Sequence, residues 1–186
     1  MENKLLFNSL AKLLTYPQEE YSVYCRTALN ETERLSNSSS EKKEILSNAF
    51  ANLEIFTSQI AVKSQSQREE LFTQSFDINP IGNLEVGWHL YGEQYERGAF
   101  LVECRNLLRE YRIEESVELP DHLSHLLLLV GEMDLEKGNN FTEKNILPAM
   151  EKILLKFQTE ENPFKHLLLS IKEILIAQFE IGVNHA

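Results

Sequence analysis

Apolar side chains recur three and four residues apart along almost the whole chain, which is the pattern of amphipathic helices. One clear example is the run Tyr21, Tyr24, Cys25, Ala28 and Leu29. Alternating runs rich in Val and Ile are absent, so no sheet is expected. The sequence predicts an all-α fold, a single domain over residues 1–186 with seven or eight helices. The expected helices cover residues 3–14, 18–35, 41–62, 66–76, 93–113, 120–137, 141–158 and 163–181.

Two segments shape the expected architecture. The last helix, at 163–181, is apolar on nearly every side, so it should lie at the centre of the molecule. Residues 77–92 break the helical pattern, because proline and glycine recur there too often for a long helix. We expect a loop there with at most one short helical turn, between an N-terminal and a C-terminal helical layer. We also expect a helix start or kink near Pro148, and a helix end at Gly138.

Composition narrows the possible partners. The 186 residues are 42% hydrophobic, which is enough for a core, and the net charge is −11. No cluster of Lys and Arg is present, so nucleic acid and anionic membranes are poor partners and a basic peptide is a better one. An acidic surface that serves only solubility is the plainer explanation of the charge.

The cysteine count and the absence of an apolar segment indicate the compartment. Cys25 and Cys104 form no Cys-x-x-Cys pair, so two reduced and buried thiols are expected. No apolar run reaches the roughly 20 residues of a membrane span, and the first residues lack a signal peptide's features. We expect a cytoplasmic protein.

The segment Glu118–Leu123 is the most distinctive motif in the chain. Pro120 suits the first turn of a helix, and Asp121 adds negative charge where a helix dipole favours it. His122 and His125 should then lie one turn apart on one side of that leucine-rich helix. Such a cluster is either a plain helix start or a place where a partner docks.

Most catalytic motifs are absent from the sequence. There is no phosphate-binding glycine loop, no nucleophile elbow and no His-Glu-x-x-His zinc motif, so an enzyme, including a nucleotide hydrolase, is unsupported. No histidine has a glutamate three residues before it, which argues against a di-iron bundle. No cofactor is expected. One alternative stays open: a helical regulatory protein that binds a metal or small molecule through Asp121, His122 and His125.

Aromatic side chains gather around the interrupted segment and could line a groove for a peptide. Tyr and Trp supply large contact areas at low entropic cost. Aromatic residues at helical spacing are more often core residues, so only their concentration here favours the groove. The candidate peptide-binding residues are Phe72, Phe76, Trp88, Tyr91, Tyr95, Tyr111, Leu119, Pro120, Asp121, His122 and His125.

Several of these motifs together resemble one family. Phe76-Asp77, Tyr91-Gly92, Arg97-Gly98, Leu107, Tyr111 and Glu118–Leu123 are similar to the run found in NarJ-type proteins, and so is Leu13–Glu20 at the start of the chain. NarJ-type proteins are the delta-subunit assembly chaperones of respiratory nitrate reductase, within the TorD/DmsD/NarJ group. The resemblance spans about residues 5–130. Trp88-His89 and Ser124 depart from the usual pattern and leave the client enzyme open.

The resemblance implies an all-helical cytoplasmic chaperone that is not an enzyme. Such a chaperone binds the N-terminal peptide of a molybdoenzyme's catalytic subunit, of twin-arginine type or its remnant, until the molybdenum cofactor is inserted. Asp121 and His122 would then lie at the peptide groove, with Pro120 shaping its wall. A basic client peptide would face the acidic residues Glu110, Glu114, Glu115, Glu118 and Asp121. Either a monomer or a domain-swapped dimer would be compatible with this role.

Overall fold

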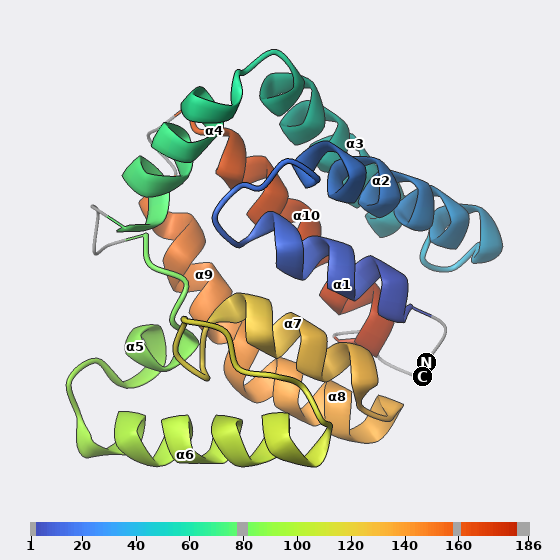
Figure 1. The fold of residues 1–186 in the computed structure, drawn as a ribbon. Helices are drawn as coiled ribbons and strands as arrows, with labels where there is room; N and C mark the ends of the chain where they lie inside the picture. The colour runs from blue at the N-terminus through green and yellow to red at the C-terminus, as the bar shows by residue number, and fades with distance from the viewer. Residues whose placement is uncertain (1–2, 78–81, 158–160, 182–186) are drawn as a thin grey trace.

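The computed structural model describes residues 3–77, 82–157 and 161–181, and every regular element within them is a helix (Figure 1). The elements are α1 (Lys4–Leu13), α2 (Tyr21–Ser38), α3 (Lys43–Ala61), α4 (Gln65–Phe72), the π turn η1 (Thr73–Asp77), α5 (Val86–Tyr91), α6 (Tyr95–Glu110), α7 (Leu123–Glu132), α8 (Leu135–Phe141), the π turn η2 (Thr142–Ile146), α9 (Leu147–Lys156) and α10 (Pro163–Phe179).

The predicted all-α fold is confirmed. When α8, η2 and α9 are counted as the continuous helix that they form, and η1 as the last turn of α4, the described residues contain nine helices. Eight of these have at least seven residues. The short helix α5 lies inside the segment 77–92, where a single helical turn was expected; residues 78–81 of that segment lie outside the described part.

Helix α10 lies at the centre of the molecule, as its sequence predicts (Figure 1). It packs along α3 and also contacts α8 and α9, and both faces of the helix carry buried residues. Helix α1 packs between α2 and α7. Helices from the two halves of the chain therefore share one hydrophobic core, in which each buried Leu or Phe contributes about 1.5–3 kcal/mol.

Local sequence signals account for several helix starts. The Ser64 hydroxyl accepts a hydrogen bond from the Gln67 amide, and the Gln67 side chain accepts one from the Ser64 amide, which forms a capping box for α4. Asn162 caps α10 by accepting from the Phe164 amide at 2.9 Å, with Pro163 in the first turn. These hydrogen bonds stabilise the starts of α4 and α10.

The predicted helix over 120–137 is wrong at both ends. Helix α7 begins only at Leu123, and the chain leaves it at Met133 and restarts at Asp134, whose side chain caps α8. Gly138 does not end a helix: it lies buried inside α8, where a Cβ atom would be 2.3 Å from Cε1 of Phe179. Glycine is therefore required here for the close packing of α8 on α10, and not for a helix C-cap.

The expected start or kink near Pro148 is confirmed as a π turn. Leu147 donates its amide to the carbonyl of Thr142, five residues back, directly before Pro148. Proline cannot donate to the fourth carbonyl before it and its ring crowds that carbonyl. The wider turn η2 lets α8 continue into α9 despite the proline.

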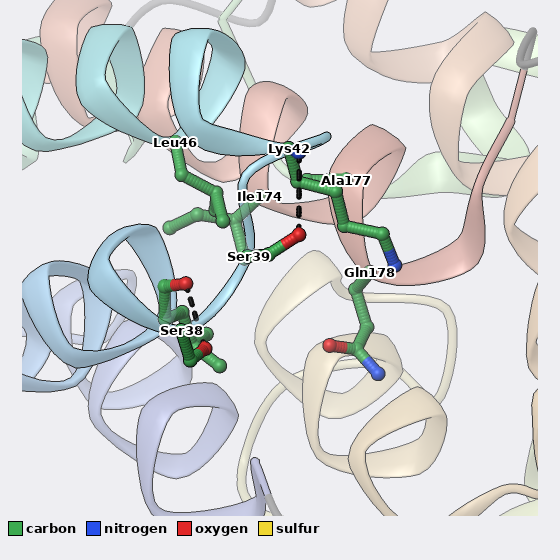
Figure 2. Close-up of a pocket in the computed structure, with 8 residues that line it drawn as sticks. Ser38, Ser39, Lys42, Leu46, Ile174, Ala177 and Gln178 are labelled. Atoms are coloured by element: carbon green, nitrogen blue, oxygen red, sulfur yellow. Dashed lines mark hydrogen bonds between the residues drawn. The ribbon is translucent and has the colours of Figure 1, made fainter.

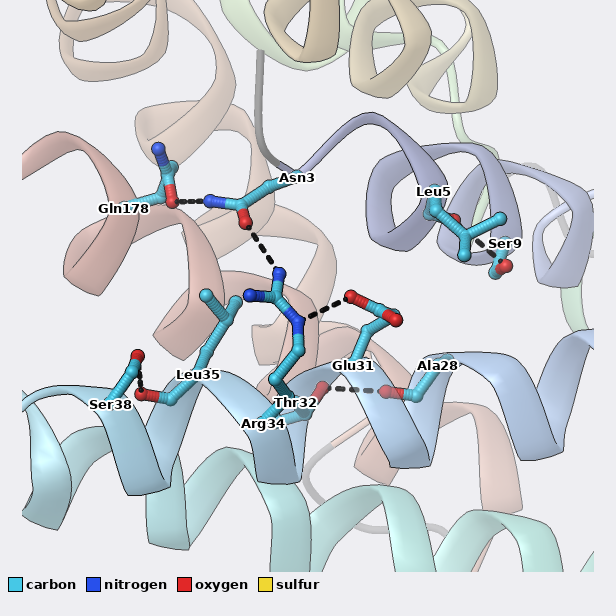
Figure 3. A network of polar contacts seen from close by, with 10 residues as sticks. All are labelled: Asn3, Leu5, Ser9, Ala28, Glu31, Thr32, Arg34, Leu35, Ser38 and Gln178. Atoms are coloured by element: carbon cyan, nitrogen blue, oxygen red, sulfur yellow. Dashed lines mark hydrogen bonds and ion pairs between the residues drawn. The ribbon is translucent and has the colours of Figure 1, made fainter.

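A polar network connects the first described residue to α2 and α10 (Figure 3). The side-chain Nδ2 of Asn3 donates to the side-chain oxygen of Gln178 on α10. Arg34 on α2 donates to the side-chain Oδ1 of Asn3 at 3.3 Å and also pairs with Glu31. These contacts hold the start of α1 against the end of the central helix.

Both thiols are free and buried, as predicted. Burial raises the pKa of Cys25 to about 11, so it stays protonated at neutral pH. Among the described residues no helix combines the length and the apolar character that a membrane crossing requires.

We predict opposite effects for two glycine-to-alanine changes within helices. Gly138→Ala should lower the free energy of unfolding by about 1–3 kcal/mol, because the new methyl group meets the buried Phe179 ring. Gly98→Ala in α6 meets nothing within 4 Å and should raise it by about 0.5–1 kcal/mol through helix propensity. Urea unfolding followed by circular dichroism measures both values. Equal effects of the two changes would contradict the packing role of Gly138.

Candidate functional site

The start of α5 and the start of α7 meet in a single antiparallel bridge between Glu85 and His122. The Val86 amide donates to the Asp121 carbonyl at 3.0 Å, and the Leu123 amide donates to the Leu84 carbonyl at 2.8 Å. This junction brings the loop before α5 beside the Glu118–Leu123 motif.

Asp121 is fully buried and holds this junction together. Its Oδ2 accepts a hydrogen bond from the Gly87 amide at 2.9 Å, in the first turn of α5, and so places negative charge at that helix start. A Cβ atom on Gly87 would be 2.6 Å from Asp121 Oδ2 and 2.9 Å from Cδ1 of Phe100, so glycine is needed. The sequence predicts that Asp121 acts at the start of its own helix. In the structure its carboxylate lies instead at the start of α5.

The environment of Asp121 is unusual for a carboxylate. Its Oδ1 has no hydrogen-bond partner among the described residues. Burial raises the pKa of Asp121, and the Gly87 hydrogen bond opposes this only in part. Because the side chain is out of reach of solvent, Asp121 positions other groups and does not itself present a surface.

His122 caps α7 and is held in one tautomer. Its Nδ1 accepts from the Ser124 amide at 3.3 Å, so the Ser124 hydroxyl, 2.7 Å away, must be the donor in the second bond. Burial, with a smaller contribution from His125, lowers the pKa of His122 to about 3, so the ring is neutral at physiological pH. Its other nitrogen, Nε2, has no partner in the described part of the chain.

His125 uses both ring nitrogens. Nδ1 donates to the Leu119 carbonyl at 2.9 Å, and Nε2 accepts from the Ser116 amide at 3.0 Å. Because these bonds engage the atoms that a metal would need, Asp121, His122 and His125 do not form a preorganised metal site. Across the described ranges, no cluster of three His, Cys, Asp or Glu side chains has metal-binding geometry.

A crevice of about 330 Å³ opens beside this junction. Its walls come from the end of α4 and η1, from the loop before α5, and from the segment before α7. The lining residues are Phe72, Phe76, Asp77, Asn83, Leu84, Glu85, Glu118 and His122.

One wall of the crevice is aromatic and is backed by the core. The Phe72 and Phe76 ring centroids are 5.2 Å apart, and Phe76 packs against Phe164 of α10 at 4.7 Å. The π turn η1 contributes Phe76 and Asp77 to this wall. The wall is therefore rigid and apolar.

Three carboxylates also line the crevice, and one of them has an ion-pair partner in the described structure. Glu85 pairs with Arg97, whose guanidinium lies 5.1 Å from the centroid of the Trp88 ring. Neither Asp77 nor Glu118 has an ion-pair partner among the described side chains. Partial burial, and to a smaller extent the charge of Asp77, raises the pKa of Glu118. The electrostatic potential in the crevice is therefore negative.

The structure brings only part of the predicted set to this crevice: Phe72, Phe76 and His122. Pro120 and Asp121 are buried behind it, and Leu119 is 40% exposed beside it. Trp88 stacks on Arg97, Tyr91 packs 5.7 Å from Phe100, and Tyr111 lies beside Lys137. Tyr95 is 89% exposed at the start of α6. None of these last four lines the crevice.

The sequence did not predict three of the lining residues, Asn83, Leu84 and Glu85. They lie in a segment whose glycine content predicts only a loop, and nothing in their spacing indicates that Glu85 pairs with His122 across the bridge. No sequence signal marks them, because the need for a glycine at Gly87 is visible only in the structure.

A second pocket, of about 140 Å³, lies between the α2–α3 turn and the end of α10 (Figure 2). Its polar groups already have partners: Ser39 accepts from the Lys42 amide, Ser38 donates to the Leu35 carbonyl, and Lys42 pairs with Glu180. The crevice beside His122 is the stronger candidate because its polar groups are less satisfied.

We predict that the pKa of Asp121 makes stability depend on pH. Its folded-state pKa lies above the unfolded value, so its contribution is full at low pH and is lost as pH rises through the folded pKa. Asp121→Asn keeps an acceptor for the Gly87 amide but does not titrate. The unfolding free energy of wild type minus that of Asp121→Asn should therefore fall as pH rises from 4 to 7 in urea titrations.

Asp121→Ala provides the comparison for this experiment. It leaves the Gly87 amide buried without a partner and should be about 1–3 kcal/mol less stable than Asp121→Asn at every pH, because neither variant titrates at this position. If the unfolding free energies of wild type and Asp121→Asn change with pH in parallel, Asp121 has the same pKa in the folded and unfolded states and the prediction is wrong.

Comparison with known proteins agrees with the resemblance read from the motifs. No family model matches the chain. The chain is 24% identical to the probable nitrate reductase molybdenum cofactor assembly chaperone NarJ of Bacillus subtilis (strain 168). The alignment spans 189 residues and covers 100% of this chain and 94% of the relative. The chain is thus similar, over its full length, to a NarJ-type assembly chaperone.

Proposed function

We propose that this protein is a cytoplasmic assembly chaperone, not an enzyme, for a molybdoenzyme related to nitrate reductase. In this role it binds the N-terminal peptide of the catalytic subunit while the molybdenum cofactor is inserted, before that subunit docks or is exported. The observation that carries the proposal is the crevice beside His122, which combines an aromatic wall with unpaired carboxylates.

The aromatic wall suits the apolar face of a peptide. Phe72 and Phe76 are already packed on Phe164, so a peptide side chain that contacts them need not order them first. Binding then costs little side-chain entropy at this wall.

The carboxylates suit the basic residues of the same peptide. Asp77 and Glu118 repel each other in the free protein, and an arginine or lysine between them would remove that repulsion. The unpartnered Nε2 of His122 can donate a hydrogen bond to a peptide carbonyl, because Nδ1 is the acceptor in the tautomer that Ser124 fixes.

The residues of the motif divide between two roles in this proposal. His122 and Glu118 contact the peptide, whereas Asp121 and Pro120 hold α5 and α7 so that the crevice keeps its shape. Contacts of the peptide with Trp88, Tyr91, Tyr95 and Tyr111 would have to lie outside the crevice. No observation supports the alternative of a metal-dependent regulator, because both ring nitrogens of His125 are engaged in hydrogen bonds.

We predict that Glu118→Gln weakens binding of the client peptide about fivefold to thirtyfold, the range expected when one partly exposed charge pair of 1–2 kcal/mol is lost. The probe is a synthetic peptide with the N-terminal sequence of the host nitrate reductase catalytic subunit, titrated by calorimetry. Glu143→Gln removes the same charge from an exposed position that does not line the crevice, and should leave affinity unchanged. Equal affinities for wild type and Glu118→Gln would remove the proposed site.

The same titration should depend on pH with a definite sign. The pKa of Glu118 is raised in the free protein, so lowering the pH toward that value protonates it and removes a negative charge from the crevice. Affinity for the basic peptide should therefore rise with pH across the acid range and level off near neutral pH. In Glu118→Gln this rise should be smaller; an unchanged pH profile in that variant would assign the dependence to another group.

A further inference from the structure

The loop between α6 and α7 exposes apolar side chains that the core does not use. Val117 is 100% exposed and Leu119 is 40% exposed, on either side of the crevice residue Glu118. A single exposed valine needs no explanation. Two apolar residues that flank a binding-site carboxylate on a fixed loop form a more specific arrangement.

His125 fixes the shape of this loop, which we call the clamped loop (residues 114–119). Its ring lies between two loop backbone groups, accepting from the Ser116 amide at 3.0 Å and donating to the Leu119 carbonyl at 2.9 Å. The ring is 2% exposed, so the clamp is protected from competing water. The Glu118 amide also donates to the Ser116 hydroxyl at 3.2 Å.

The entry to the clamped loop is fixed as well. Arg112 ends α6 in the left-handed conformation with φ of 57°, and the Ile113 amide returns to the Leu108 carbonyl at 2.8 Å. Arg105 on α6 then holds both carboxylate oxygens of Glu115, at 3.0 and 3.1 Å. The loop is therefore restrained on both sides of Val117.

The charges next to Val117 indicate what this surface would bind. Glu115 is neutralised by Arg105, while Glu114 and Glu118 have no ion-pair partner in the described structure and lie on the same loop. An apolar tip with uncompensated negative charge on both sides complements a segment that is apolar and positively charged.

We infer that the clamped loop is a second docking surface for the client, which takes the apolar and basic stretch of peptide that continues out of the crevice. This inference rests on the proposed function. Val117 and Leu119 supply the contact area, and His125 is a positioning residue that presents them. Because the loop is ordered before binding, little conformational entropy is lost when the peptide docks.

The first experiment removes the apolar contact and leaves the fold intact. The double variant Val117→Ser with Leu119→Ser should bind the synthetic client peptide about tenfold more weakly than wild type, the loss expected for one buried aliphatic side chain. Val62→Ser is the matched control, since Val62 is 84% exposed at the end of α3 and should change nothing.

The second experiment tests the clamp. His125→Ala should weaken peptide binding in the wild-type loop and weaken it less in the double serine variant, because part of its effect is to present Val117 and Leu119 and the rest is to hold Glu118 on the same loop. Amide exchange of Ser116 should accelerate in His125→Ala. If that variant does not fold, Arg105→Gln loosens the loop from the exposed side and should show the same dependence on Val117 and Leu119.

The outcomes separate the two proposals. If Glu118→Gln weakens binding and the double serine variant does not, the crevice stands and the second surface is wrong. If neither change affects affinity, both are wrong. Additive losses from His125→Ala and the double serine variant would show that His125 acts through the general fold, and would overturn its positioning role. Non-additive losses, with Val62→Ser unchanged, support the inference.

Discussion

The hydrogen bond from the Gly87 amide to the buried carboxylate of Asp121 determines the geometry of the candidate site. It fixes where α5 begins, and the bridge beside it aligns Glu85 with His122. Both partners of this hydrogen bond are constrained. Residue 87 must be glycine because a side chain would clash with Asp121 and Phe100, and burial opposes the ionisation of Asp121. A well-packed apolar residue would be cheaper to bury than this carboxylate, but it could not accept the Gly87 hydrogen bond that fixes the start of α5.

Two histidines one turn apart in this protein perform different tasks, although the sequence makes them look like a pair. His122 caps α7 and keeps one nitrogen available at the crevice, whereas His125 uses both nitrogens to hold the preceding loop. The distinction arises from the backbone, since His122 precedes the first helical residue and His125 follows it by two positions. Sequence spacing alone treats them as neighbours on one helix face and therefore suggests a metal site.

The helical pattern predicted most of the fold, and the reasons for its failures are physical. The apolar periodicity located α10 at the centre, and Pro148 correctly indicated a helix start or kink, which the structure shows to be a π turn. The helix end predicted at Gly138 is wrong because glycine is common both at helix ends and where helices pack closely. Only the position of the Phe179 ring shows that close packing is the reason here. For the site, Phe72, Phe76, His122 and Glu118 were foreseen, but Asn83 and Glu85 were not, because a single bridge between distant segments leaves no periodic trace. Peptide contacts stay predictions for all of these residues.

The contact of Phe164 with Phe72 and Phe76 has a consequence for biosynthesis. The aromatic wall is made by residues from the first half of the chain but is supported by the last helix, so a nascent chain cannot complete it while α10 is still inside the ribosome. The N-terminal helices leave the ribosome first, so Phe72 and Phe76 cannot pack against Phe164 until α10 has also been synthesised. Under the proposed function, the ability to capture a client would appear only when synthesis has passed α10.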